Sequence, residues 1–357
     1  MKIINKLLAL LAICFVLLSC NQGIEGKVIF TEDSFPKSFN LYKIDSISLI
    51  NADVLDPIYM RYHPKGYLLF LDRGTENLVK ILNIKSGAIQ KMIKKGRGPE
   101  ECVHISTISV INNSVYLHGS ALRKMLKLEI DSSGIFQITK CLNLGVQAGR
   151  FVALSNNLFA GTTYTKDRIG YYNNKGKFLY KTGGGPLNID NCKDKSTLPN
   201  ILFQTKITTS ANGKYIALAN MLIDVLEIYS NKGDTISILR GPDGIKTKVT
   251  SKDVGVGRMS VLDPFFFAYR DIKSFSNEIW VSYSGIKLEK RKMPDYNKIL
   301  PNKIYCFSWQ GEPIRKIELE NKFSAFAIDY NNLKLYCLEK SPIPKIVIYD
   351  IKNIINH

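Results

Sequence analysis

A unit of paired strand patterns separated by polar turns recurs six times along this chain. The later half of the unit is an apolar run that ends in a polar turn closed by glycine. It occurs at residues 79–87, 126–134, 169–176, 226–233 and 304–311, and at 346–353, where asparagine replaces glycine. The earlier half occupies residues 58–72, 106–118, 150–161, 208–219, 272–283 and 323–338. Such a repeat indicates a fold assembled from copies of one supersecondary unit.

The spacing of the repeat selects one all-β architecture. The closing glycines lie 47, 42, 57 and 78 residues apart, and the last interval, to Asn353, is 42 residues. Four antiparallel strands in about 40–50 residues, with room for insertions, are typical of a β-propeller blade. We therefore predict an all-β, six-bladed β-propeller with four-stranded antiparallel blades. A pair of β-sandwiches, the main competitor, would not repeat the same four-strand pattern six times.

The two ends of the repeat predict how the ring closes. The last unit shows strands near 323–328, 333–338 and 345–350, and too few residues follow for a fourth. Residues 43–50 alternate partly between apolar and polar side chains and precede the first unit. A strand from this segment would seal the ring and remove exposed sheet edges. We therefore predict one propeller domain, residues 39–357, closed by an N-terminal strand.

The first residues predict a lipoprotein signal peptide over 1–19. Lys2 and Lys6 precede an apolar run at residues 7–18 that is too short to span a bilayer of about 30 Å. The following Leu-Leu-Ser-Cys sequence is typical of a bacterial lipobox, which would make Cys20 the lipidated residue. An ordinary secretory signal is the alternative. Because several acyl chains give stable anchoring, we expect residues 20–38 to form a lipidated cysteine and tether at the membrane.

Charge points to an anionic partner. Without residues 1–19 the chain has 47 basic and 31 acidic side chains, a net charge of +16. Excess lysine favours association with anionic surfaces, whereas the export signal and the lack of a recognisable motif disfavour nucleic acid. Four long segments open on one face of the predicted ring and together carry +7: residues 94–104, 183–203, 240–258 and 284–302. We expect this long-loop face to bind a protein or an acidic ligand.

One short motif carries a resemblance to a known family. The sequence Lys-Gly-Arg-Gly-Pro-Glu-Glu at residues 95–101 resembles a loop of the TolB-like six-bladed propeller lipoproteins of Gram-negative envelopes. The resemblance implies a propeller scaffold and leaves its function open. A purely structural role, turning the chain from an outer strand to the next inner one, is the alternative for the loop. The candidate binding-face residues are Arg97, Glu100, Glu101, His104, Lys290, Arg291 and Lys292.

Catalytic constellations are not visible. The four histidines are not spaced as a zinc pair, and no Gly-x-Ser-x-Gly motif occurs. We therefore predict no catalytic residue, metal or cofactor, and leave open the alternative of an envelope hydrolase or lyase. Its site would lie at the mouth of the central channel, where His104 and His118 could approach Glu100 or Glu101. Since Asn21 and Gln22 follow the cysteine, rather than an aspartate of the inner-membrane retention type, we expect the periplasmic side of the outer membrane rather than the cell surface.

Overall fold

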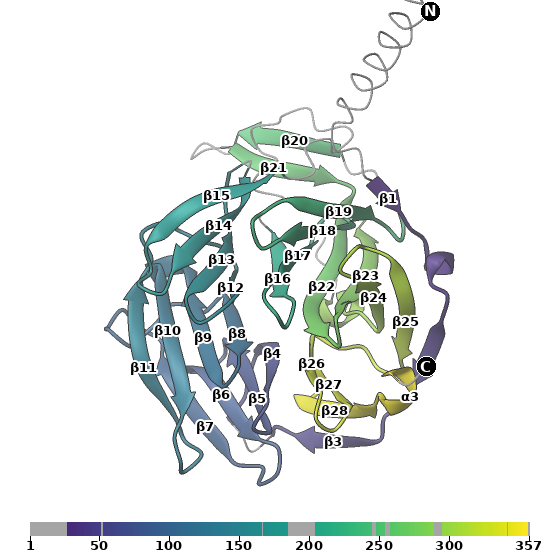
Figure 1. Ribbon diagram of the computed structural model, residues 1–357. Helices are drawn as coiled ribbons and strands as arrows, with labels where there is room; N and C mark the ends of the chain where they lie inside the picture. Colours follow the sequence, from purple (N-terminus) through teal and green to yellow (C-terminus); the bar gives the residue numbers. More distant parts are fainter. Residues whose placement is uncertain are drawn as a thin grey trace, which may run out of the picture.

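The computed structural model describes residues 27–50, 53–165, 167–184, 204–244, 248–253, 258–288, 295–340 and 342–355. Six sheets are arranged in a ring (Figure 1). In each blade the first strand lies nearest the axis and the fourth lies at the rim. The prediction of an all-β, six-bladed propeller is confirmed.

The blades follow one another along the chain, and consecutive strands within a blade pair antiparallel. Blades 1 to 3 comprise β4 (Pro57–His63), β5 (Tyr67–Asp72), β6 (Asn77–Asn83) and β7 (Ile89–Lys94); β8 (Thr107–Ile111), β9 (Ser114–Gly119), β10 (Lys124–Ile130) and β11 (Phe136–Asn143); and β12 (Phe151–Ala153), β13 (Leu158–Thr162), β14 (Asp167–Asn173) and β15 (Phe178–Gly184). Blades 4 to 6 comprise β16 (Thr205–Thr209), β17 (Tyr215–Asn220), β18 (Val225–Ser230) and β19 (Thr235–Arg240); β22 (Phe265–Phe275), β23 (Glu278–Leu288), β24 (Lys303–Ser308) and β25 (Pro313–Leu319); and β26 (Ala325–Asp329), β27 (Lys334–Glu339), β28 (Lys345–Asp350) and β3 (Asp45–Ser48).

The strand sequences fit the stacking of the blades. The second strands β5, β9, β17 and β27 are buried along nearly their whole length. A strand covered on both faces is apolar without alternation, as in the run Leu68-Leu69-Phe70-Leu71. The rim strands β11 and β15 keep many exposed residues instead. The hydrophobic core therefore lies between neighbouring blades, around the whole ring.

The repeated glycines close the hairpins between the third and fourth strands. The backbone φ angles are positive at Gly87, Gly134, Gly176, Gly233 and Gly311, between 72° and 92°. Glycine adopts this conformation without the steric cost that a Cβ atom brings. In the sixth copy, where Asn353 replaces the glycine, the chain instead enters the short helix α3 (Lys352–Ile355).

The missing strand of blade 6 comes from the N-terminal side. β3 pairs antiparallel with β28, with Ser48 opposite Lys345 and Ile47 opposite Ile346. Leu49 follows β3 and is fully buried. The strand predicted from residues 43–50 therefore closes the ring.

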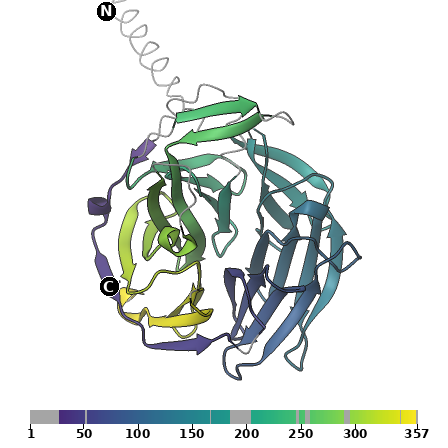
Figure 2. The same cartoon turned by 180° about the vertical axis from the view of Figure 1, so that it is seen from behind.

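The segment before β3 forms a strap along the rim, as seen in both face views (Figures 1 and 2). β1 (Lys27–Ile29) pairs parallel with β19, and β2 (Ser38–Leu41) pairs parallel with β25. Between them, η1 (Glu32–Ser34) places Glu32 Oε1 2.6 Å from Lys303 Nζ and 2.9 Å from the Tyr305 hydroxyl. β1, within the segment expected to act as a tether, therefore adds a fifth strand to blade 4, and β2, which begins at the last residue of that segment, adds a fifth strand to blade 5.

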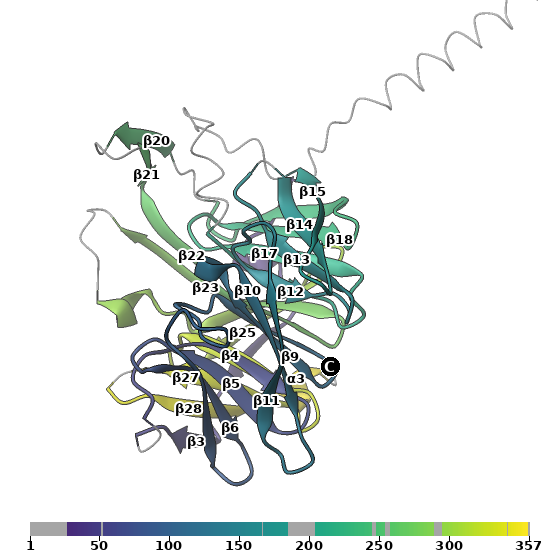
Figure 3. The ribbon, with the colours of Figure 1, turned by 90° about the vertical axis from the view of Figure 1, so that its left-hand side faces the viewer.

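The long connections fall where the repeat predicts them. They follow the fourth strands of blades 1, 3 and 4, and join the second and third strands of blade 5. The connection from blade 4 to blade 5 contains the hairpin β20 (Lys248–Asp253) and β21 (Arg258–Asp263). Figure 3 shows this hairpin and the ends of β22 and β23 projecting from one face of the ring. The turns that follow the first and third strands open on the other face and are all short. We call this face the short-turn face. Two further 3-10 turns are η2 (Ser120–Leu122) and η3 (Tyr296–Ile299).

Candidate functional site

The inner strands bring a group of cations together around Tyr59 at the axis of the ring. Tyr59, on β4, is 4% exposed. Lys273 Nζ lies 4.6 Å, Arg61 Cζ 4.7 Å and Lys206 Nζ 5.5 Å from the centroid of its ring. These distances allow cation–π attraction, and the cations come from blades 1, 4 and 5. We define the Tyr59 cluster as Tyr59, Arg61, Arg150, Lys206, Asp271 and Lys273.

The carboxylate of this cluster is already engaged. Both Asp271 oxygens lie 2.7 Å from Lys273 Nζ, and the backbone N–H groups of Ile272 and Phe326 donate to them at 2.9 and 3.2 Å. Asp271 and Lys273 are 1% and 5% exposed. Such a pair neutralises itself, so Asp271 offers little compensation to the other cations.

The two arginines bond to neutral groups. Arg61 Nη1 donates to the carbonyl of Ile272 at 3.2 Å, and Arg150 Nη1 donates to the carbonyl of Ser106. A carbonyl satisfies a donor without cancelling its charge, so both guanidinium charges persist at the axis. Burial lowers the pKa of Arg150 but raises the pKa of Tyr59 to about 12, which keeps this phenol neutral at physiological pH.

Lys206 is the least compensated cation of the cluster. Burial and then the positive charge of Arg150 lower its pKa to about 7, with Arg270 and Arg61 acting in the same direction and Asp271 opposing them. In the part of the chain that the structure describes, no acceptor lies within hydrogen-bond distance of its amine. The cluster thus combines four basic groups with one carboxylate. An anion at the axis would relieve their mutual repulsion.

A cavity of about 410 Å³ lies at one end of this cluster. Arg61 and Lys273 line it, together with the short turns after the inner strands, at residues such as Pro64, Asn112, Ala211 and Asn277. These turns place the mouth of the cavity on the short-turn face. Access to Arg61 and Lys273 is therefore through the face opposite the long loops.

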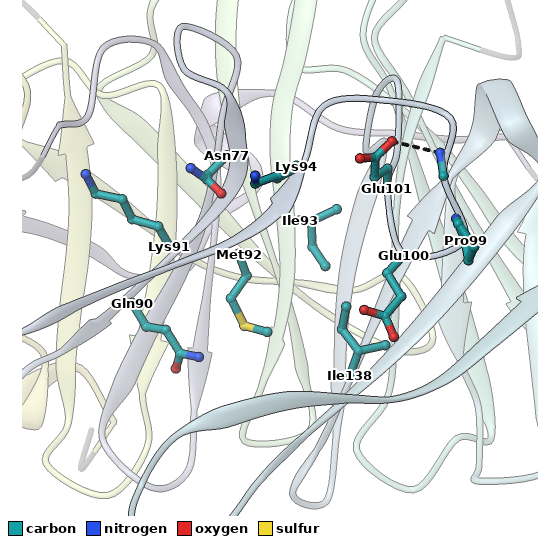
Figure 4. Close-up of a pocket in the computed structure, with 11 residues that line it drawn as sticks. Asn77, Gln90, Lys91, Met92, Ile93, Lys94, Pro99, Glu100, Glu101 and Ile138 are labelled. Carbon is teal, nitrogen blue, oxygen red and sulfur yellow. Dashed lines mark hydrogen bonds between the residues drawn. The ribbon is translucent and has the colours of Figure 1, made fainter.

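A second, larger cavity of about 600 Å³ lies at the rim between β7 and β11 (Figure 4). Gln90 bridges the two blades beneath it: its side-chain amide donates to the Phe136 carbonyl at 2.7 Å and accepts from the Phe136 N–H at 2.9 Å. Lys91, Lys94 and Glu100 also line this groove. Since both signs of charge are present in an open groove, it shows no marked preference for an anion.

The glycine-proline loop, residues 95–101, is stabilised by hydrogen bonds within the loop and from Lys124. Glu101 Oε2 accepts from the Gly98 N–H at 2.8 Å, and a Cβ at Gly96 would lie 2.0 Å from the same oxygen. Lys124 Nζ donates to the carbonyls of Gly98, Pro99 and Glu101. The contacts around the glycines and Glu101 favour the structural alternative for this motif.

The described residues of the predicted binding face, Arg97, Glu100, Glu101 and His104, make no hydrogen bond or ion pair with one another. Arg97 and Glu100 are exposed, and Glu100 points into the rim groove (Figure 4). His104 is partly buried, and burial followed by the charge of Arg150 lowers its pKa. His118 is 1% exposed, contacts the Ser106 hydroxyl through Nδ1 at 2.8 Å, and has its pKa lowered by burial to about 3. His118 is therefore a neutral, buried side chain.

Several sequence-based predictions fall outside the described residues: the lipidated Cys20 and the basic triplet Lys290, Arg291 and Lys292. Within the described ranges, no group of three or more acidic, cysteine or histidine side chains is arranged to hold a metal, and no helix is long and apolar enough to cross a membrane. The described cysteines form no disulfide. Three of them, Cys102, Cys306 and Cys337, are buried, as expected for small apolar side chains.

Sequence reasoning missed the Tyr59 cluster. Its signal is nevertheless present, because Arg61, Lys206 and Lys273 each place a charged residue inside the first strand of a repeat. Inner strands are otherwise largely apolar or hydroxyl-bearing, as in β8 and β26. Comparing the same position in all six repeats would have identified these charges.

Comparison with known proteins places the chain in a family. No curated protein matches. Among solved structures, the chain is similar to the β-propeller domain of Myceliophthora thermophila Cps50 (Swd1), with 11% identity, 87% of this chain and 100% of that chain covered, and a TM-score of 0.47. It is also similar to virginiamycin B lyase of Staphylococcus aureus, with 15% identity, 86% and 88% covered, and a TM-score of 0.48. The family model described as TolB-like 6-blade propeller-like matches residues 74–331, and the chain therefore belongs to the TolB-like six-bladed propeller family.

Proposed function

We propose that this chain is a lipid-anchored protein of the cell envelope that binds an anionic ligand in its central channel. The observation that carries the proposal is the Tyr59 cluster, in which Arg61, Arg150 and Lys206 lack a carboxylate partner among the described residues. All three side chains are partly withdrawn from solvent. Unpaired charge is costly to withdraw from water, and a ligand of opposite charge would offset that cost. A bound anion would supply the missing partner.

Binding is better supported than catalysis by the described side chains. Asp271 is engaged with Lys273, and His118 is buried against Phe151, with ring centroids 5.1 Å apart. The Glu101 carboxylate accepts from the backbone of its own loop. A hydrolase or lyase would need an acid and a base within reach of one bound substrate, and no observation favours such a pair.

The proposed location follows from the N-terminal sequence. A lipid on Cys20 would hold the ring at a membrane, and the periplasmic side of the outer membrane remains our expectation. The basic triplet Lys290–Arg291–Lys292 remains a proposed contact for an anionic partner surface on the long-loop face. Such a contact would lie on the opposite face of the ring from the cavity at Arg61, so the two proposals can be tested separately.

Thermal unfolding in the presence of small anions tests the channel. We expect citrate or phosphate to raise the melting temperature of the mature chain, since a ligand at 100 times its Kd stabilises by about 2.7 kcal/mol. Arg61→Gln should remove most of this shift. Lys214→Gln, which removes an exposed cation from a turn on the same face, should retain it. Equal shifts for all three proteins, or none for the wild type, would contradict anion binding at the channel.

A further inference from the structure

The cavity at the short-turn face, which we call the short-turn pocket, has a lining more specific than a simple anion site. Two cations, Arg61 and Lys273, stand at its inner end, and its lining contains no carboxylate. Six hydroxyl-bearing residues and four aromatic residues form half of the remaining lining, and most of the other half is small or aliphatic. The hydroxyl-bearing and aromatic residues are Ser109, Thr208, Thr209, Ser210, Ser274 and Ser276, with Tyr62, Phe275, Trp309 and Tyr330. A lining of this kind suits a molecule that carries one acid group and several hydroxyls.

The size of the pocket limits the ligand. Its volume of about 410 Å³ lies near the lower end of the range of about 300–1,000 Å³ for small-molecule sites. A cavity of this size admits a small molecule or the end of a polymer, but not a longer stretch of chain. The described lining fits a compact ligand that reaches from Arg61 at the inner end of the pocket to Tyr330 at its mouth.

Part of the hydroxyl lining is available for a ligand. Within the described part of the chain, the hydroxyls of Thr208, Ser274 and Ser276 have no hydrogen-bond partner. Ser109 Oγ accepts from the Ala153 N–H at 3.0 Å and retains its own proton for donation. Thr209, by contrast, donates to the Tyr215 carbonyl at 2.8 Å. The available hydroxyls come from blades 2, 4 and 5, so they face the pocket from several sides.

The aromatic wall is held in place by neighbouring blades. Tyr62 and Tyr330 pack edge to face with ring centroids 5.2 Å apart, and Asn331 Nδ2 lies 3.2 Å from the Tyr62 hydroxyl. Tyr330 is 46% exposed at the mouth of the pocket. Tyrosine combines an apolar ring face with a polar tip, which suits the alternating C–H and O–H surfaces of a sugar ring.

We propose that the short-turn pocket binds an acidic sugar unit, with its carboxylate at Arg61 and its ring hydroxyls at Thr208, Ser274 and Ser276. The inference rests on the proposed anion-binding function and specifies its ligand class. The planar guanidinium of Arg61 can present two donors to a carboxylate, a geometry that a lysine ammonium does not offer. Lys273, paired with Asp271, supplies a further donor at the inner end.

Three small probes separate the contributions of charge and hydroxyls. Galacturonate carries both, acetate carries the acid alone, and galactose carries the hydroxyls alone. Calorimetric titration should show galacturonate binding at least about tenfold more tightly than either of the others. Trp309 lines the pocket although it is only 1% exposed, so tryptophan fluorescence gives a second readout. Trp280, in a separate core cluster, contributes the background.

Two variants test the assigned contacts. Thr208→Val removes one hydroxyl at nearly constant volume. It should weaken the binding of galacturonate by roughly three- to tenfold, the fold-change expected for one neutral hydrogen bond, and leave the binding of acetate unchanged. Arg61→Gln should weaken the binding of both galacturonate and acetate. Lys214→Gln serves as the matched control and should bind all probes as the wild type does. Comparing galacturonate with its trimer distinguishes a free sugar acid from the end of a polysaccharide as the source of the unit.

The outcomes distinguish this inference from the proposal beneath it. If acetate and galacturonate bind equally, or if Thr208→Val weakens both equally, the acidic-sugar assignment is overturned and anion binding stands. If galacturonate does not bind, but inorganic phosphate binds to the wild type and not to Arg61→Gln, the acidic-sugar assignment is again overturned and anion binding stands. If no anion binds at the channel, both proposals fail.

Discussion

Replacing Lys206 with methionine should stabilise the protein at neutral and acidic pH. Methionine fills a similar volume and carries no charge, so it removes the cation that Arg150, Arg270 and Arg61 repel. The native pKa of Lys206 is about 7, against an ordinary value of 10.5 in the unfolded chain. Between these two values the unfolded state binds more protons than the native state. The stability of the wild type should therefore rise with pH across this window.

The magnitude follows from the linkage of protonation to folding. One group can change the free energy of unfolding by at most about 1.4 kcal/mol per pH unit where it is deprotonated in the native state and protonated in the unfolded one. Because Lys206 is only partly buried, we expect about 2–3 kcal/mol in total between pH 7 and 10.5 rather than the full ceiling of about 5. Below pH 7 both states are protonated, and the penalty is constant and complete.

Urea unfolding at pH 6, 7, 8 and 9 measures this effect as a difference between two proteins. Lys206→Met should be more stable than the wild type at pH 6, by about 2–3 kcal/mol, and the gap should shrink as pH rises. Taking the difference cancels the titration of groups common to both proteins, such as His104. Lys214→Met, an exposed lysine on the short-turn face, controls for the loss of a positive charge as such. A constant gap from pH 6 to 9, or a less stable Lys206→Met at pH 6, would refute the reasoning.

Four further predictions concern the strap, the closing strand, the anchor and the basic loop. Phe30→Ala should lower the free energy of unfolding by about 3–5 kcal/mol, because Phe30 is 1% exposed and its ring centroid lies 5.1 Å from that of Phe307. In the same urea unfolding assay, Ile29→Ala, at a neighbour that is 73% exposed, should change it by no more than about 0.5 kcal/mol. Deleting residues 43–50 should lower the melting temperature of the whole domain; an unchanged value would contradict ring closure by β3. Cys20→Ala should release the protein from sedimented membranes with its fold intact, and retention at high salt would exclude a lipid anchor. Replacing Lys290, Arg291 and Lys292 together by Gln should weaken salt-dependent binding to anionic liposomes with little change in stability, and equal, salt-independent binding would exclude this loop.

The repeat made the fold predictable because each blade carries its own local signals. Gly87 and its four equivalents mark turns that need a positive φ, and the runs between them are strand patterns of similar length. These signals depend on neighbours in sequence and need no knowledge of the assembled ring. The strap was harder to predict from the sequence, because Phe30 and Phe35 are isolated aromatics whose burial depends on Tyr305 and Phe307, about 270 residues away.

The central cluster could not be predicted in the same way. Arg61, Arg150, Lys206 and Lys273 are spread over more than 200 residues, about one to each of four blades, and each looks like an isolated polar position within or next to a strand. Only closure of the ring brings these positions to one axis. The motif that was noted in the sequence, residues 95–101, has contacts that explain it without a ligand. Glu101 accepts from the backbone of its own loop, and Lys124 on β10 donates to the carbonyls of that loop.

The energetics of the cluster indicate why its charges have a use outside folding. Replacing buried charged groups by well-packed apolar side chains is often neutral or stabilising, so stability alone gives no reason to keep Lys206 beside Arg150. A binding site reverses this balance, because the repulsion that costs stability becomes attraction for an incoming anion. The two roles therefore predict opposite signs for one substitution: Lys206→Met should gain stability and lose anion affinity. A side chain kept for folding would lose stability when replaced, and affinity would change only through misfolding.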